Sequence, residues 1–568
     1  MKSRTKFVQQ ILPIFLLTAI IGSSWVLRIN RLDQFKLTDE TKWAFRSANF
    51  TLALKRGEYA QTFQRSHPGV TTMWAGWVGM QVAMPDYAQN ATRYVENTSY
   101  RVDLRHNGAE VMQILVPARH VAIALSMLVM AICFFYLKRL FGVIPAFLGT
   151  MLLAFEPFFI GHTRILHVDG LLSIFMYLSL VSFLAFLMER KLPDLIISGF
   201  AAGLTWLSKT PGLYLVAGIA AVAAIFWLFQ QKTWREKLAP RQLWTEVWPL
   251  IGWGAVGVAT FFILWPAMWV EPVAILKQLV LESIDYAVGG HSSPVIFNGV
   301  IYRDGIIPPS VWQYYPAAYL WRASPVVLVG LLLSVILVFG RKLLHFDRKV
   351  RLANLGLVLF ALGYIVFMTA GSKRSDRYVL PVFPPLCVAA GLGWAALIKM
   401  VQENVEREFL RTVSLLTVSV AMVMQLVLPL LYRPYYISYF NPLMGGARRA
   451  PEVLQIGWGE GLDEAARYIN SMPGAQQMVV ASWYERVFSE FFVGDTINIE
   501  DMPRISQGEL QQILAADYIV IYYHQFQRAM PENLLAILKD EEPIHRLWFD
   551  GLEYVRIYDP DEFTQMDR

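Results

Sequence analysis

Residues 170–188 form the stretch GLLSIFMYLSLVSFLAFLM, which carries no charged side chain. A helix needs about 20 predominantly apolar residues to cross the hydrocarbon core of a bilayer. The whole chain has the same character: of its 568 residues, 55% are hydrophobic and only 17% are charged, and the mean hydropathy is +0.40. The sequence therefore predicts an α-helical polytopic membrane protein.

Working outward from this stretch, about eleven transmembrane helices are expected, of which the third and fifth have the weakest signals. They cover residues 11–29, 116–137, 143–160, 170–188, 195–207, 212–229, 247–269, 323–340, 352–370, 379–398 and 412–431. The first follows a basic start, as a signal peptide does. Because no small-residue cleavage site follows before Arg28, we expect this span to be retained.

The orientation follows from the basic residues of the short loops, which favour the cytoplasmic side. With the N-terminus inside and the C-terminus outside, the inner loops hold Lys138, Arg139, Arg190, Lys191, Lys232, Arg235, Lys237, Arg241, Arg341, Lys342, Arg348, Lys349, Arg351, Lys399, Arg407 and Arg411. Most of the polar mass then lies outside, in loops 30–115 and 271–322 and after residue 432.

Two domains are predicted. Residues 1–432 form the transmembrane domain, whose first outer loop carries an acidic pair. In residues 433–568, short apolar runs at 478–481 and 518–522 alternate with helix-like stretches around 463–472 and 531–538, which indicates a small extracytoplasmic α/β domain.

The composition also excludes some classes of function. The net charge of +6 is explained by membrane orientation, and no basic stripe with stacking aromatics indicates nucleic-acid binding. Both cysteines, Cys133 and Cys387, fall inside apolar runs, so neither a disulfide framework nor a cysteine metal site is expected.

The first outer loop contains the acidic pair Asp39 and Glu40, which opens a predicted helix. Two interpretations stand side by side. The carboxylates could complement the helix dipole with Thr38 as the cap, or they could be catalytic. The same loop contains His67 followed by Pro68, a pattern that is usually only a turn.

The loop between the third and fourth spans is dense in ionisable groups and contains Arg164, His167 and Asp169. It could simply keep its polar groups in water. Lys209 lies at the end of the fifth span, where it could be a lysine that extends its ammonium to the interface. Ionisable groups at such positions also tend to mark function.

The strongest anomaly is the stretch GSKRSDRY at 371–378, which places Lys373, Arg374 and Arg377 in one loop on the predicted outer side. The positive-inside rule disfavours cations there. Lys and Arg match phosphate oxygens through charge-assisted hydrogen bonds. We therefore expect a phosphate at the outer interface.

Together these four places resemble the family 39 glycosyltransferases of the membrane-embedded C superfamily, which includes protein O-mannosyltransferases and lipid A aminoarabinose transferases. The acidic pair is similar to the one in that family's first outer loop, and His67 with Pro68 looks like its His-Pro element. The stretches 164–170 and 373–381 resemble its Arg-to-Asp and Lys, Arg-Tyr-Leu-Leu-Pro elements. Gly69 and the C-terminal α/β segment depart from the protein O-mannosyltransferase pattern, which leaves the acceptor open.

The resemblance implies an inverting transfer of a sugar from a polyprenyl-phosphate donor to an acceptor hydroxyl, with the following roles. The expected catalytic residues are Asp39 as general base and Glu40 and Asp169 as orienting groups. The expected donor phosphate ligands are Lys373, Arg374, Arg377, Lys209 and Arg164. The residues expected to bind acceptor or sugar are His67, His167 and Tyr378.

No cofactor is predicted, although a divalent metal has candidate ligands on the outer side in Asp39, Glu40, His67, His162, His167 and Asp169. The partners expected are the lipid-linked donor, the bilayer and a protein, lipid or glycan acceptor. The absence of a retention tail favours a prokaryotic plasma membrane. The rival predictions are a transporter or flippase, which usually shows repeat symmetry, and a non-catalytic scaffold.

Overall fold

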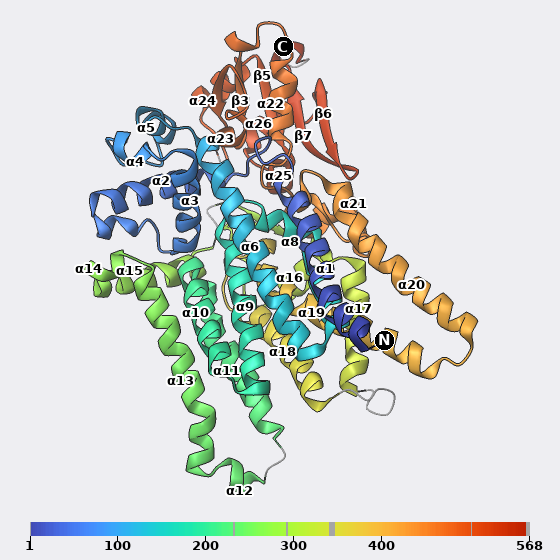
Figure 1. The fold of residues 1–568 in the computed structure, drawn as a ribbon. Helices are drawn as coiled ribbons and strands as arrows, with labels where there is room; N and C mark the ends of the chain where they lie inside the picture. The colour runs from blue at the N-terminus through green and yellow to red at the C-terminus, as the bar shows by residue number, and fades with distance from the viewer. Residues whose placement is uncertain (1, 231–232, 291–292, 340–346, 501, 564–568) are drawn as a thin grey trace.

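The computed structural model describes residues 2–230, 233–290, 293–339, 347–500 and 502–563. Long helices form a bundle, and a helical lobe and a five-stranded sheet stand together at one end of it (Figure 1). Of the predicted positions, Lys232, Arg341, Lys342 and the last residue of the span 323–340 lie outside the described residues.

Within the described residues, eight helices are long and apolar enough to cross a membrane, or up to ten if two bent pairs each count as one. The eight involve α1 (Lys2–Ile29), α6 (Val111–Phe141), α9 (Val168–Glu189), α11 (Tyr214–Leu228), α13 (Pro240–Ile263), α18 (Arg348–Thr369), α19 (Phe383–Asn404) and α20 (Glu408–Val427). The predicted polytopic helical fold is confirmed. The predicted count of eleven differs because residues 195–207 lie in α10 (Leu192–Ser208), which is shorter than a full span.

The two bends are joined by a buried polar network. Helix α7 (Val143–Ala154) meets α8 (Pro157–Thr163) at 68°, and α16 (Tyr314–Arg322) meets α17 (Pro325–Phe339) at 115°. At the first break, the carboxylate of Glu156 accepts a hydrogen bond of 3.0 Å from the Ser324 amide at the second break. Gln425 of α20 accepts from the Ser324 hydroxyl at 2.8 Å. Backbone groups freed by a bend must be satisfied inside the protein, and this network satisfies one of them.

The first predicted outer loop forms the helical lobe, with α2 (Glu40–Arg56), α3 (Val70–Ala83), α4 (Tyr87–Asn90) and α5 (Tyr100–His106). Trp43, Phe50 and Met73 belong to its own buried apolar cluster. The helix predicted to follow the acidic pair is α2. Its N-cap position is held by Asp39 rather than Thr38, and no side chain caps it, so the capping interpretation of this pair is not supported.

The second predicted outer loop contains α15 (Pro272–Val288) and a hairpin in which β1 (Val295–Phe297) pairs antiparallel with β2 (Val300–Tyr302). The remaining short helices of the bundle are η1 (Tyr59–Thr62), η2 (Thr210–Leu213), α12 (Trp234–Lys237), α14 (Ala267–Val270), η3 (Asp376–Val382), η4 (Leu428–Tyr432), η5 (Tyr436–Ser438) and η6 (Pro442–Met444).

The C-terminal region holds a sheet in the order β4-β3-β5-β7-β6. Strand β3 (Val479–Ser482) runs parallel to β4 (Asp495–Asn498) and β5 (Tyr518–Tyr522), whereas β7 (Leu552–Tyr558) pairs antiparallel with β5 and with β6 (His545–Phe549). The helices around it are α21 (Gly446–Val453), α22 (Leu462–Asn470), η7 (Ala475–Gln477), α23 (Glu485–Phe488), α24 (Gln507–Leu514), α25 (Tyr523–Arg528), α26 (Glu532–Leu538) and η8 (Pro560–Glu562). The predicted small α/β region is confirmed.

The boundary after residue 432 stays a prediction. The chain that follows it packs into the bundle before it reaches the sheet. Tyr436 donates a hydrogen bond of 2.8 Å to the Leu27 carbonyl of α1, and the Asn441 amide donates one of 2.7 Å to the Trp321 carbonyl of α16. This packing holds the C-terminal sheet directly over the end of the bundle (Figure 1).

Candidate active site

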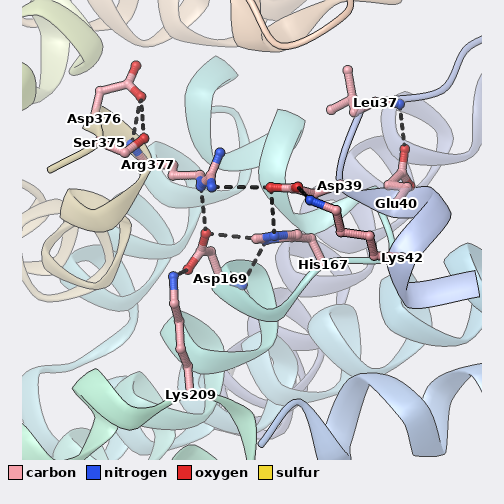
Figure 2. Close-up of polar contacts among 10 residues, drawn as sticks. All are labelled: Leu37, Asp39, Glu40, Lys42, His167, Asp169, Lys209, Ser375, Asp376 and Arg377. Atoms are coloured by element: carbon pink, nitrogen blue, oxygen red, sulfur yellow. Dashed lines mark hydrogen bonds and ion pairs between the residues drawn. The ribbon is translucent and has the colours of Figure 1, made fainter. Parts of the chain in front are cut away.

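Asp39 lies at the start of α2 and faces Lys42 of the same helix and side chains from two distant segments (Figure 2). Its carboxylate is 3.2 Å from Nη2 of Arg377, 3.1 Å from Nζ of Lys42 and 3.9 Å from Nε2 of His167. Burial raises the pKa of Asp39, but the charges of Arg377 and Lys42 outweigh it and hold the pKa well below its ordinary value. Asp39 is therefore a carboxylate at neutral pH.

Asp169 provides a second carboxylate from the first turn of α9, with only 2% of its side chain exposed. Nζ of Lys209, at the end of α10, lies 2.7 Å from Oδ1, and Nδ1 of His167 lies 3.2 Å from Oδ2. Nε of Arg377 is 3.5 Å from the same Oδ2. Arg377 thus bridges the two carboxylates, and Figure 2 shows them on either side of its guanidinium.

The position of Arg377 is fixed by its neighbours. It belongs to η3, and its amide donates a hydrogen bond of 2.8 Å to the Asp376 carboxylate. Asp376 in turn accepts from Arg322 of α16 at 2.8 and 2.6 Å. On the other side, the guanidinium carbon of Arg377 lies 4.3 Å from the centre of the Trp458 ring. An arginine restrained in this way loses little entropy when it binds an anion.

Glu40 has a different role from the one predicted. Its buried carboxylate accepts hydrogen bonds from Nε of Arg119 at 2.8 Å, from the Leu37 amide at 3.0 Å and from the Leu166 amide at 2.9 Å. In Figure 2 it points away from Asp39, and it does not line the cavities described below. The predicted catalytic role of Glu40 is therefore corrected to an anchoring one, because its oxygens are already occupied.

Two of the predicted phosphate ligands also have other functions. Arg164 donates hydrogen bonds to the carbonyls of Arg28 at 3.1 Å and Pro434 at 2.7 Å, and it lines none of these cavities. Arg374 donates to the carbonyls of Pro308 at 3.0 Å and Thr369 at 2.9 Å. Both guanidinium groups tie segments of backbone together. The phosphate role predicted for Arg164 is therefore corrected, whereas Arg374 also lines the polar cavity described below, so the role predicted for it stays a prediction.

Arg374 donates hydrogen bonds to backbone carbonyls, whereas the ammonium of Lys373 forms neither a hydrogen bond nor an ion pair with any described residue. It lies 3.4 Å from the centre of the Tyr286 ring of α15. Burial, assisted by Arg377 and Lys209, lowers the pKa of Lys373 to about 8. A cation with no protein counter-charge is suited to receive an anion.

His67 packs edge-on against Tyr286, with the two ring centres 4.0 Å apart. Both ring nitrogens are buried without a hydrogen-bond partner among the residues that the structure describes, and burial lowers the pKa of His67 to about 3, so the imidazole is neutral. Tyr378 lies under Lys209, with the ammonium 4.1 Å from its ring centre. The structure therefore brings His67, His167 and Tyr378 to the same place as the ionisable cluster.

Three adjoining cavities meet at this cluster. The polar cavity, of about 300 Å³, is lined by Thr38, Asp39, Lys42, His162, Tyr286, Tyr314, Arg322, Lys373, Arg374, Ser375, Asp376, Arg377, Ile437, Gln455, Gly457, Trp458, Tyr484 and Arg528. The apolar cavity, of about 330 Å³, is lined by His67, Lys209, Thr210, Pro211, Leu213, Ser283, Tyr286, Ala287, Val288, Phe367, Met368, Ala370, Gly371, Ser372, Lys373 and Tyr378.

The connecting cavity, of about 100 Å³, is lined by Asp39, Lys42, Trp43, Arg46, Arg65, His67, His167, Val168, Lys209, Tyr286, Arg377 and Tyr378. It shares Asp39 and Arg377 with the polar cavity, and it shares His67 and Lys209 with the apolar cavity. Leu213, Val288 and Phe367 of the apolar cavity are also exposed on the outside of the helices. That cavity therefore opens sideways between η2, α15 and α18.

Several lining residues were not found from the sequence. Lys42 follows Asp39 by three positions on α2, a spacing that could have indicated the ion pair. Tyr286 lines all three cavities, yet a single tyrosine in a long loop gives no signal. Trp458 comes from the C-terminal region, which the sequence did not connect with the site.

The candidate metal ligands are held by other partners or lie apart. Among the residues that the structure describes, no three His, Cys, Asp or Glu side chains are grouped so as to hold a metal ion. His162 packs between the rings of Phe158 and Trp458, and Asp169 is paired with Lys209.

Residues 111–265 match the family model described as dolichyl-phosphate-mannose-protein mannosyltransferase. This match confirms the predicted resemblance over residues 111–265, which contain one of the four stretches that carry it, residues 164–170. The matched stretch begins with α6, ends just after α13, and contains His167, Asp169 and Lys209 of the site. No curated protein matches the sequence.

Three solved structures are similar to this chain at low identity. ArnT from Cupriavidus metallidurans bound to undecaprenyl phosphate is 14% identical, with 96% of this chain and 97% of that chain covered and a TM-score of 0.45. Archaeal AglB from Archaeoglobus fulgidus is 12% identical over 99% and 75%, with a TM-score of 0.46. The Pmt1-Pmt2 complex of S. cerevisiae is 15% identical over 46% and 34%, with a TM-score of 0.35. Because all three TM-scores are low, nothing about the site is inferred from them.

Proposed function

We propose that this protein is an inverting glycosyltransferase that moves a sugar from a polyprenyl-phosphate donor to an acceptor hydroxyl. One observation carries the proposal. Asp39 and Arg377, 3.2 Å apart, line both the polar cavity and the small cavity that connects it with the apolar cavity. A lipid-linked donor and a polar acceptor would need a junction of this kind to meet.

The donor is proposed to occupy the apolar cavity. Leu213, Val288 and Phe367 offer an apolar surface for the isoprenoid chain where the cavity opens between helices. At its inner end, the ammonium of Lys373 would bind the phosphate and Lys209 would add positive charge. The description of the matched family model, which names a dolichyl-phosphate sugar, supports this class of donor.

The acceptor is proposed to enter from the polar cavity. Its hydroxyl oxygen would form a bond with the anomeric carbon while the bond from that carbon to the phosphate oxygen breaks. The hydroxyl proton would pass to Asp39, and the electron pair would leave on the polyprenyl phosphate, whose added charge Lys373 and Arg377 would stabilise. A single displacement of this kind inverts the anomeric configuration.

The low pKa of Asp39 is compatible with its role as general base if Arg377 also binds the donor phosphate. In the structure described, Arg377 pairs with Asp39, which weakens the carboxylate as a base. A donor phosphate beside Arg377 would compete for the guanidinium, and the pKa of Asp39 would rise toward its ordinary value. Donor binding would thereby activate the base.

The sugar is proposed to lie in the connecting cavity, against His67, His167 and Tyr378. Asp169 would act there by holding His167 and Lys209 in place, since it is ion-paired with Lys209 and its Oδ2 lies 3.2 Å from Nδ1 of His167. The unpartnered nitrogens of His67 leave it able to hydrogen-bond a sugar hydroxyl.

Replacement of Lys373 by Gln is expected to raise the KM for the donor about tenfold or more, because a hydrogen bond to a charged group contributes roughly 1.5–3 kcal/mol. The pKa of about 8 adds a pH dependence: above pH 8 the ammonium loses its proton, so kcat/KM for the donor should fall. The Lys373→Arg variant keeps its charge, and its kcat/KM should stay level through pH 9. Identical pH profiles for wild type and Lys373→Arg would contradict this role.

No divalent metal is proposed for the reaction, because Lys209, Lys373 and Arg377 already supply positive charge around the proposed phosphate position. We expect EDTA to leave the rate of transfer unchanged. A loss of turnover that Mg²⁺ or Mn²⁺ restores would contradict this expectation.

The site is proposed to face the extracytoplasmic side of a prokaryotic plasma membrane, as the loop charges predict. The acceptor could be a protein, lipid or glycan hydroxyl. The experiment that tests the function uses proteoliposomes with a radiolabelled polyprenyl-phosphate sugar. Transfer of label to a hydroxyl acceptor supports a transferase, whereas movement of intact donor between leaflets without transfer supports the rival flippase.

A further inference from the structure

A glycine-rich loop of the C-terminal region reaches into the site. Residues 457–461 have the sequence GWGEG and precede α22. Gly457, Gly459 and Gly461 all have positive φ angles, of 79°, 119° and 87°. Side chains at these positions would be strained, so the three glycines allow a tight loop with Trp458 at its tip.

Tyr522, at the end of β5, holds this loop to the sheet. Its hydroxyl accepts a hydrogen bond from the Gly459 amide at 3.1 Å and donates one to Glu460 at 2.7 Å. Glu460 also accepts from the Trp458 amide at 2.6 Å. A Cβ on Gly457 would lie 2.3 Å from the Tyr522 hydroxyl. The loop conformation is therefore tied to the C-terminal sheet.

Trp458 contacts Arg377, His167 and the backbone next to Asp39. Its ring centre lies 4.3 Å from the guanidinium carbon of Arg377, and its ring packs edge-on against His167 at 5.0 Å. Its carbonyl accepts a hydrogen bond of 3.2 Å from the amide of Thr38, the residue before Asp39. Only 9% of Trp458 is exposed, so this packing is well shielded from water. One residue thus touches Arg377 and the backbone that carries Asp39.

We propose that Trp458 is a positioning residue, whose indole face holds Arg377 toward the reacting atoms and through which the C-terminal region completes the active site. The proposal rests on the glycosyltransferase function proposed above. A guanidinium over an aromatic face is attracted by the ring and is held parallel to it, and the attraction is strongest where water is excluded. The indole would keep the guanidinium of Arg377 in one plane while its ion pair with Asp39 is replaced by an ion pair with the donor phosphate.

The test compares Trp458→Phe with Trp458→Leu in the purified full chain reconstituted in proteoliposomes. Phe keeps an aromatic face and Leu keeps only apolar bulk. We expect Leu to lower kcat about tenfold with little change in the KM for the acceptor, and Phe to stay within about threefold of wild type. Trp548→Leu, at an exposed tryptophan of β6, is the matched control and should behave as wild type.

Equal losses in the Phe and Leu variants, or an unchanged kcat in the Leu variant, would overturn the proposal. Tyr522→Phe provides a second measurement that leaves Trp458 intact. It removes only the hydroxyl that fixes the loop, and it should lower kcat severalfold, whereas wild-type kcat would overturn the proposal. If the wild-type protein transfers no sugar at all, the proposed function itself fails, and this inference fails with it.

Discussion

The Asp39→Asn variant is expected to lose about 10²- to 10⁴-fold in kcat, the usual contribution of a general base. Asn has nearly the same shape as Asp, so the packing around α2 should persist. It cannot accept the acceptor proton, and it no longer carries the charge that pairs with Arg377. The measurement is the initial rate of sugar transfer at saturating donor and acceptor.

Asp33→Asn is the matched control, since Asp33 is an exposed carboxylate six positions earlier in the chain. It should retain wild-type turnover. A fall of less than tenfold in Asp39→Asn, with the control unaffected, would remove Asp39 from the role of base.

The Glu40→Gln variant is expected to affect stability instead of chemistry. Arg119 and Glu40 are both fully buried and pair with each other, and removing one partner of a buried ion pair costs about 3–5 kcal/mol in the free energy of unfolding. The measurement is the unfolding of detergent-solubilised protein by denaturant or heat. The fraction that remains folded should transfer sugar at close to the wild-type rate.

Glu96→Gln, at an exposed carboxylate of the same lobe, is the control for Glu40→Gln and should leave the unfolding transition in place. The opposite result for Glu40→Gln, wild-type stability with turnover abolished, would show that Glu40 takes part in catalysis. We thus expect substitution of Asp39 to lower turnover and substitution of the adjacent Glu40 to lower stability.

The fold was largely predictable because spanning helices must be long and apolar, as residues 170–188 are. The number of straight spans was not, because α7–α8 and α16–α17 bend where Glu156 and Ser324 meet. That contact joins positions 168 residues apart, and no local pattern encodes it.

The convergence of the site was predicted in part. Asp39 and Arg377 are 338 residues apart, and the signs that they could meet were the side of the membrane assigned to their loops and the family resemblance. The side of the membrane on which a loop lies does not determine the direction in which a side chain points. Successive residues of a helix point about 100° apart, so Asp39 and Glu40 diverge. Lys373 and Arg374 likewise differ, because the guanidinium of Arg374 is hydrogen-bonded to backbone carbonyls, whereas the ammonium of Lys373 lies over the Tyr286 ring.

The most direct test is a structure of the Asp39→Asn variant in a lipid nanodisc with a polyprenyl-phosphate sugar bound. The proposed mechanism predicts the phosphate beside Lys373 and Arg377, the isoprenoid chain in the apolar cavity, and the anomeric carbon facing residue 39. A donor whose phosphate lies away from both cations, or whose sugar faces away from residue 39, would contradict it.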